Sequence, residues 1–155
     1  MVMVRTQYSK EIRGENTARA MATELDISPK HAIEIAAFLR RKNTDDAIEY
    51  LTSVRDLKKA IPFRRFKRNV AHKRGLSPVA SGRYPVKAAK EYIKLLESVK
   101  KNAEYIGLDT GALKIVHVSA NRGRRVTGFF PRAMGRATPK RRETVNLEVI
   151  VREVS

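Results

Sequence analysis

Few residues of this sequence could carry out catalytic or metal chemistry. The three histidines, His31, His72 and His117, are far apart and share no repeated spacing with Asp or Glu. Asp45 and Asp46 are adjacent, and neighbouring residues on a helix do not face each other, so helix capping explains this pair better than a catalytic dyad. The chain has no cysteine, which excludes a thiolate nucleophile and a Cys-based zinc site. We therefore predict no catalytic residue, no metal and no cofactor.

Lysine and arginine offer a different chemistry, the binding of anions. The net charge is +17, and two segments without any acidic residue, 57–90 and 110–142, hold 20 of the 33 basic residues. The rest of the chain has 33 − 20 = 13 basic and 16 acidic residues, so it is close to neutral. A nearly neutral body with two cationic segments is typical of a protein that binds a polyanion such as nucleic acid.

The first of these segments has aromatic residues among its basic ones. Residues 63–84 show no amphipathic pattern, and Phe63, Phe66 and Tyr84 are interleaved with lysine and arginine. Basic side chains bind phosphates, and aromatic rings stack on unpaired bases. We therefore predict nucleic-acid contacts from this segment, made by Arg64, Arg65, Lys67, Arg68, Lys73, Arg74 and Arg83.

The second segment joins two predicted strands. The C-terminal strand has one apolar face, formed by the alternating residues Val145, Leu147, Val149 and Val151. Its expected antiparallel partner is residues 113–120, which are rich in β-branched side chains. The connection between them, residues 121–142, has eight basic and no acidic residues and is far longer than a hairpin turn requires. We predict a basic β-arm that projects about 35 Å, at roughly 3.3 Å per residue.

Three helices are predicted ahead of this strand pair. The first follows Ser28-Pro29, where the serine side chain can accept a backbone N–H, and extends to about Arg41. The second begins at Thr44, a capping residue that is followed by two acidic residues at the positive end of the helix dipole. The third covers about residues 85–106 and ends at Gly107. Residues 17–27 fit a helix or a strand equally well, because alanines favour the first and alternating apolar residues favour the second.

Composition limits the class of protein. A chain of 155 residues with 42% hydrophobic content is large enough for one domain with its own core. The N-terminus lacks the apolar core of a signal peptide, and no run approaches the ~18 apolar residues of a membrane span. We expect a soluble intracellular protein that does not bind a membrane.

Several stretches resemble the universal large-subunit ribosomal protein family that is numbered twenty-two in bacteria and seventeen in eukaryotes. The strongest match is residues 131–151, PRAMGRATPKRRETVNLEVIV. Similarity extends to DISPKHAIEIAAFLRRKNTDDAIEYL at residues 26–51 and to NAEYIGLD at residues 102–109. The segment IPFRRFKR, residues 61–68, is similar to archaeal and eukaryotic members, and the lack of a long C-terminal tail favours the archaeal type.

The resemblance implies an α+β fold, a three-stranded antiparallel sheet packed on three helices, with a long basic β-hairpin extension. Residues 17–27 would then form a strand. The chain would be a single ribosomal-protein domain, residues 1–155, with a basic insertion at about 62–84 and an extended arm at about 121–142. The implied role is that of a structural constituent of the large subunit of the cytoplasmic ribosome, which binds rRNA, aids assembly and contacts neighbouring ribosomal proteins.

The resemblance also implies a function for the arm. Its tip, formed by Met134, Gly135, Arg136 and Ala137, would line the nascent-peptide exit tunnel and contact the nascent polypeptide. No small-molecule substrate is implied. The arm residues expected to contact rRNA are Arg122, Arg124, Arg125, Arg132, Lys140, Arg141 and Arg142.

Two alternatives remain open at the level of sequence. An architectural DNA-binding protein could also use a basic β-arm, which would place Pro131 and its neighbours in a minor groove. Such a protein would typically dimerise to present two arms, whereas residues 63–84 supply this chain with a second basic surface. The apolar arm residues Phe129, Phe130 and Met134 fit a clamp between the two strands of the arm as well as they fit contact with RNA or the tunnel.

Overall fold

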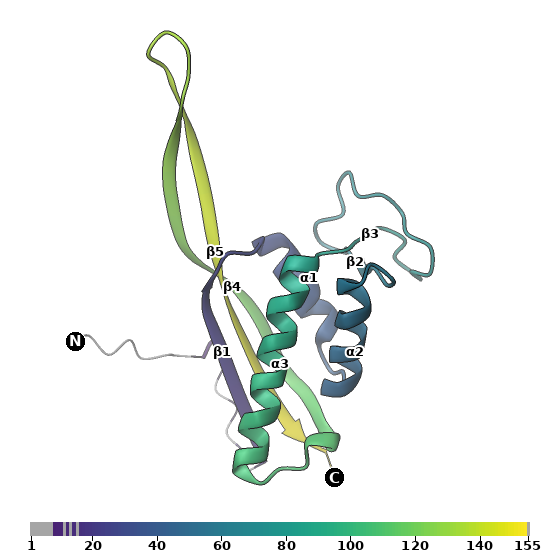
Figure 1. Cartoon of the computed structure of the whole chain (residues 1–155). Helices are drawn as coiled ribbons and strands as arrows, with labels where there is room; N and C mark the ends of the chain where they lie inside the picture. The colour runs from purple at the N-terminus through teal and green to yellow at the C-terminus, as the bar shows by residue number, and fades with distance from the viewer. Residues whose placement is uncertain (1–7, 11, 13, 15, 155) are drawn as a thin grey trace, which may run out of the picture.

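The computed structural model describes residues 8–10, 12, 14 and 16–154, which form a three-stranded antiparallel sheet with helices on one face (Figure 1). The strand order is β1-β5-β4, and β2 pairs with β3 in a separate two-stranded sheet. The predicted α+β class is confirmed. The elements are β1 (Thr17–Leu25), α1 (Pro29–Leu39), α2 (Thr44–Arg55), β2 (Ile61–Pro62), β3 (Gly82–Arg83), α3 (Val86–Ile106), the 3-10 helix η1 (Thr110–Ala112), β4 (Leu113–Pro131) and β5 (Ala137–Glu153).

Strand β5 lies at the centre of the sheet and carries the core. Val145, Leu147, Val149 and Val151 are all fully buried, as their alternation predicts. Helix α3 packs mainly across β1, α1 packs across β4, and α2 packs against α3. The opposite face of β5 is also partly covered, because Glu148 and Ile150 are buried there and the backbone N–H of Ser9 donates to the Glu148 carboxylate at 2.8 Å.

Residues 17–25 form an edge strand, which decides the choice between helix and strand. β1 pairs antiparallel with β5 from Thr17 opposite Arg152 to Leu25 opposite Val145. Ala18 and Ala20 are buried beneath α3, where their small side chains let the helix approach the sheet. The backbone pairing with β5 therefore outweighs the helix propensity of the alanines.

The first helix begins where the sequence predicts, with Ser28 as its N-cap. The expected capping hydrogen bond is wrong, because the Ser28 side chain makes none; its carbonyl accepts from the N–H of Ala32 at 3.0 Å. The helix also ends at Leu39, two residues earlier than predicted. Arg41 has φ 64° and donates its N–H to the carbonyl of Ile115 at 3.1 Å, so the chain leaves the helix in order to contact β4.

For the other two helices, the predicted cap at the start of α2 is wrong and the predicted end of α3 is confirmed. Asn43, and not Thr44, is the N-cap of α2, and Thr44 is buried with its hydroxyl donating to the carbonyl of Leu113 at 3.3 Å. Thr44 therefore connects α2 to the sheet. Helix α3 ends at Gly107, whose φ of 85° gives the left-handed C-cap that the sequence predicts.

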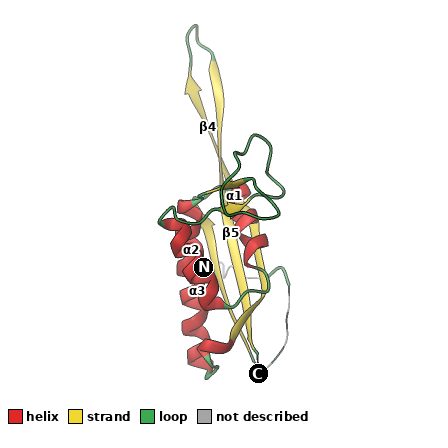
Figure 2. Cartoon of the chain, turned by 90° about the vertical axis from the view of Figure 1, so that its right-hand side faces the viewer, coloured by secondary structure: helices red, strands yellow, loops and turns green. Residues whose placement is uncertain are grey.

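Strands β4 and β5 pair over their whole length, and their outer halves form the arm. The pairing extends from Leu113 opposite Glu153 to Pro131 opposite Ala137. Figures 1 and 2 show the outer part of this hairpin projecting beyond the helices. In both views the loop between β2 and β3 lies at the end of the body from which the arm projects, so the two basic segments share one end of the molecule.

Candidate nucleic-acid interface

The arm has no core of its own. Phe129 is 72% exposed, Met134 is 92% exposed, and Phe130 is also exposed. The ammonium of Lys140 lies 4.8 Å from the centre of the Phe130 ring, a cation–π contact between the two strands. The clamp interpretation is therefore insufficient, because these apolar side chains stay accessible and require a surface outside the chain to cover them.

A tight turn of residues 132–136 closes the arm. The N–H of Arg132 donates to the carbonyl of Arg136 at 2.8 Å, and Met134 and Gly135 both have positive φ, 57° and 68°. Left-handed backbone is typical of the hairpin turns that match strand twist, and glycine adopts it without strain. Three of the four predicted tip residues lie in this turn, and Ala137 is the first residue of β5.

Two β-bulges lie where the arm leaves the body. On β4, Gly123 and Arg124 face Thr144 alone, and on β1, Thr23 and Glu24 face one residue of β5. That residue is Asn146, whose side-chain oxygen accepts from the N–H of Glu24 at 2.8 Å. Bulges bend a strand and increase its twist. Two bulges on opposite sides of β5 therefore set the direction in which the arm projects.

A carboxylate also fixes the base of the arm. Asp26, in the connection from β1 to α1, accepts two hydrogen bonds from the Arg142 guanidinium, one of them 2.7 Å long, and lies 2.7 Å from the ammonium of Lys87 on α3. Hydrogen bonds from Arg142 and then Lys87 hold the pKa of Asp26 well below its ordinary value. Arg142, a predicted rRNA contact, therefore links the arm to the body.

Two other predicted contacts on the arm are paired within the chain. Arg125 donates to the Glu143 carboxylate at 3.0 Å, and the Arg122 guanidinium lies 3.8 Å from the same group. Within the residues that the structure describes, no ion pair involves the remaining predicted arm contacts, Arg124, Arg132, Lys140 and Arg141. These four exposed cations are the strongest candidates for contact with phosphates.

The basic insertion is attached to α1 by Glu34. This side chain is 2% exposed, and its carboxylate accepts backbone N–H groups from Arg64 at 3.1 Å, Arg65 at 2.8 Å and Phe66 at 2.7 Å. The carboxylate thereby orders the backbone and leaves the arginine side chains exposed. Sequence reasoning missed Glu34, although a lone acid within the apolar stretch Ile33–Leu39 would have indicated a buried carboxylate with a specific partner.

The aromatic residues of the insertion do not behave alike. Phe63 is 1% exposed and belongs to the core, so its predicted stacking on bases is wrong. The Phe63 ring packs in the hydrophobic core and makes an edge contact with His31, with 5.5 Å between ring centres. Phe66 is partly buried, and Tyr84 lies 5.3 Å from the ammonium of Lys73.

The structure brings the insertion and the base of the arm together. A groove of about 390 Å³ along α1 is lined on one side by Arg64 and Arg65 and on the other by Ser119 and Asn121 of β4. The tip of the arm lies far from α1, the helix that borders this groove (Figure 1). The predicted contacts therefore divide into a basic surface at the body and a separate one along the arm.

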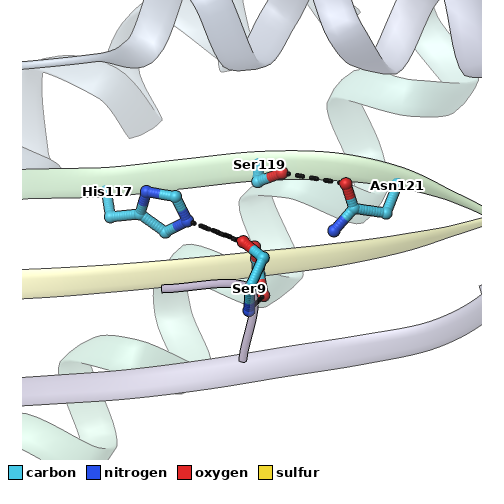
Figure 3. Close-up of polar contacts among 5 residues, drawn as sticks. Ser9, His117, Ser119 and Asn121 are labelled. Atoms are coloured by element: carbon cyan, nitrogen blue, oxygen red, sulfur yellow. Dashed lines mark hydrogen bonds and ion pairs between the residues drawn. The ribbon is translucent and has the colours of Figure 1, made fainter. Parts of the chain in front are cut away.

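One group of side chains has the composition of a catalytic triad without its geometry. Ser9 Oγ lies 3.3 Å from His117 Nε2, and the same nitrogen lies 3.1 Å from the Glu148 carboxylate, which also accepts from the Ser9 hydroxyl (Figure 3). A serine–histidine relay needs serine and carboxylate on opposite ring nitrogens. Burial disfavours ionisation of Glu148, but hydrogen bonds from Ser9 and His117 outweigh it and lower the pKa of that carboxyl. The group holds Ser9 against the sheet.

The described part of the chain lacks two other kinds of site, a membrane-spanning helix and a metal-binding cluster. None of its helices is both long and apolar enough to cross a bilayer. Residues 8–10, 12, 14 and 16–154 contain no cluster of three His, Cys, Asp or Glu side chains that could hold a metal ion.

Comparisons with known proteins agree with these observations. The model of the family described as ribosomal protein L22p/L17e matches residues 11–152. The large ribosomal subunit protein uL22 of Methanoculleus marisnigri is 67% identical over 153 residues, which cover 99% of this chain and 100% of the relative. The uL22 proteins of Methanoregula boonei and Methanocaldococcus jannaschii are 64% and 43% identical, with 99% of this chain and 100% and 98% of the relatives covered.

Proposed function

This chain belongs to the ribosomal protein L22p/L17e family, and we propose that it is a structural constituent of the large ribosomal subunit that binds large-subunit rRNA. It is of the archaeal type, as its relatives from methanogens indicate. The family is structural and not enzymatic. Its expected location is the cytoplasmic ribosome, with rRNA and neighbouring ribosomal proteins as partners.

One observation carries the proposal of rRNA binding. The two acid-free segments, which are far apart in sequence, meet along the groove between Arg64–Arg65 and the base of the arm. The backbone of the insertion is ordered there by Glu34, so its basic side chains are presented without an entropic cost for folding the loop. We propose that the predicted rRNA contacts of both segments bind phosphates, at the end of the body that carries the insertion and along the arm.

Replacing Arg64, Arg65, Lys67 and Arg68 together by alanine tests this proposal. Each lost phosphate contact should lower the slope of log affinity against log salt by about 0.7 to 0.9, so affinity for large-subunit rRNA fragments should fall and its salt dependence should flatten. Filter binding across a salt series measures both quantities.

The matched control removes four exposed cations elsewhere on the body, Arg55, Lys94, Lys101 and Arg152. This variant should retain the slope of the wild-type protein. An unchanged slope in the insertion variant would mean that the four replaced cations are only solvated in the wild-type protein. Tighter binding of the wild-type protein to bent duplex DNA than to rRNA would favour the architectural alternative.

We propose further that Met134, Gly135, Arg136 and Ala137 line the nascent-peptide exit tunnel. Support comes from the family resemblance, from the projection of the tip beyond the body, and from the exposure of the Met134 side chain. The tip offers cationic charge, a flexible apolar side chain and small residues, but no nucleophile or general base. It would act as a passive wall that the nascent polypeptide contacts.

Ala137→Trp should narrow the tunnel and leave peptide-bond formation intact. Ala137 is exposed and is not among the residues with positive φ, so added bulk there does not strain the turn, whereas a substitution at Gly135 would. Reconstituted subunits with Ala137→Trp should show altered stalling or tunnel-drug sensitivity and normal synthesis of short peptides. Ala137→Ser is the control for size. Loss of short-peptide synthesis in assembled particles would overturn the passive-wall proposal.

A further inference from the structure

A second concave site lies beside the N-terminal part of α1. This pocket of about 270 Å³ is lined by Lys30, Arg65, Arg68 and Arg83. The rings of His31, Phe63 and Phe66 complete its lining, and none of the described carboxylates contributes to it. The cations come from three separate parts of the chain, which are α1, the insertion after β2, and β3. The fold therefore brings positive charge and aromatic surface together in one cavity.

The charge of this pocket is not neutralised within the described part of the chain. No ion pair recorded there involves any of its four cations. Glu34, a neighbouring carboxylate on α1, uses both oxygens to accept backbone N–H groups of the insertion. Burial, and then the charge of Arg83, lower the pKa of His31, which favours the neutral form of its ring. The pocket thus combines four cationic side chains with an aromatic lining.

The Phe66 ring is the accessible aromatic surface of the pocket. Phe63 is buried in the core, whereas Phe66 is only partly buried. The ammonium of Lys30 lies 6.0 Å from the centre of the Phe66 ring, at the outer limit of a cation–π contact, so the lysine does not cover the ring closely. A planar group can therefore reach this ring while the arginines bind an attached anion.

We propose that this pocket binds one unpaired nucleotide of rRNA, with its base against Phe66 and its phosphates on Arg65, Arg68 and Arg83. This inference rests on the proposed rRNA binding, and it specifies that this part of the surface binds unpaired RNA. A continuous duplex offers phosphates but keeps its bases stacked and paired, so it cannot use the ring. One guanidinium group can donate two parallel hydrogen bonds to a phosphate, and an aromatic ring can stack on any base.

Two RNA hairpins can test this inference. One carries a single bulged 2-aminopurine, and the other has the same sequence without the bulge. The wild-type protein should bind the bulged hairpin more tightly, with a saturable change in 2-aminopurine fluorescence. Phe66→Ala should lower affinity for the bulged hairpin roughly 5- to 150-fold, the range for loss of one stacked base, and change affinity for the continuous hairpin less than about twofold.

Further variants separate stacking from folding. Phe66→Leu keeps an apolar side chain against the core and removes the ring, so it should lose the bulge preference even if Phe66→Ala lowers the melting temperature. Phe66→Trp should retain the preference. Tyr105→Ala is the matched control, because Tyr105 is an exposed ring on α3, outside both basic segments, and it should leave the preference unchanged.

The outcomes distinguish this inference from the proposed function. Equal wild-type affinity for the two hairpins, or a bulge preference that survives Phe66→Leu, would overturn the nucleotide pocket and leave rRNA binding in place. Failure to bind either hairpin or large-subunit rRNA fragments would overturn the proposed function itself.

Discussion

Replacing Glu34 by alanine is expected to destabilise the protein by about 3 kcal/mol, because three backbone N–H groups would lose their acceptor. Arg64, Arg65 and Phe66 donate these hydrogen bonds, and the carboxylate that accepts them is buried. Within the part of the chain that the structure describes, the N–H groups of residues 64–66 donate to no backbone carbonyl that could replace the carboxylate. The insertion should therefore loosen as the chain becomes less stable. Urea denaturation measures the loss of stability, and amide hydrogen exchange at residues 64–66 measures the loosening of the insertion.

Two further variants make this prediction specific. Glu34→Gln retains an oxygen that can accept from the N–H groups of Arg65 and Phe66, but its amide NH2 group would face the N–H of Arg64, which is also a donor. The loss of stability should therefore be smaller than for Glu34→Ala, about 1 to 2 kcal/mol. Glu49→Ala, which removes an exposed acid from α2, should change stability by less than about 0.5 kcal/mol. The anchoring role would be wrong if Glu34→Ala unfolded at the same urea concentration as Glu49→Ala.

Glu34→Ala should also weaken rRNA binding, although it removes no cation. When the insertion is no longer held by Glu34, its basic side chains must be ordered during binding, and this ordering costs conformational entropy. We expect affinity to fall while the salt dependence stays close to that of the wild-type protein, since the number of phosphate contacts is unchanged. This result would differ from that of the four-alanine variant, which flattens the salt dependence.

Gly123→Val is expected to change the direction of the arm and to destabilise the chain by about 2 kcal/mol. A Cβ at this position would lie 2.5 Å from Thr144 Oγ1 and 3.0 Å from Asn146 Oδ1. Neither neighbour can move without loss, because Thr144 donates to the carbonyl of Arg124 at 3.0 Å and Asn146 accepts from Glu24. The bulge must therefore open, and the arm above it must tilt.

Spin labels can report this movement, because the chain has no native cysteine to compete for labelling. Cysteines introduced at Arg132 on the tip and Lys101 on α3 give one distance between the arm and the body. Gly123→Val should shift or broaden that distance distribution, and large subunits reconstituted with this variant should incorporate it poorly.

Gly128→Val is the matched control, since a Cβ at Gly128 would meet no atom within 4 Å and its backbone is not left-handed. It lies on the same strand of the arm and should leave the distance unchanged. If the two variants gave the same distribution as the wild-type protein, the bulge could not be what directs the arm.

Local patterns in the sequence predict the elements whose cause is itself local. The alternation of Val145, Leu147, Val149 and Val151 identifies the core face of β5, because side chains of a strand alternate between its two sides. Gly107 marks the end of α3, because glycine adopts the left-handed conformation at little cost. The absence of acids from residues 57–90 and 110–142 likewise needs no structure to indicate a polyanion as partner.

Other features depend on partners that are distant in sequence. Residues 17–25 become a strand because β5 supplies their hydrogen bonds, about 125 residues further on. Phe63 looks like a stacking residue among arginines, but the core contacts that bury it come from elsewhere in the chain. Thr44 resembles a helix cap and instead donates to Leu113. In each case a tertiary contact outweighs a weaker local preference.

Charge and apolar periodicity along the chain are enough to predict a folded body, a basic insertion and a basic arm. The placement of these parts depends on tertiary contacts, because Glu34 holds the insertion and two bulges beside Asn146 direct the arm. A bulge has no sequence pattern of its own, and a lone acid in an apolar stretch indicates a buried carboxylate without identifying the groups that it binds. Each is stable only when backbone groups from another segment satisfy its hydrogen bonds, and those groups come together when the chain folds.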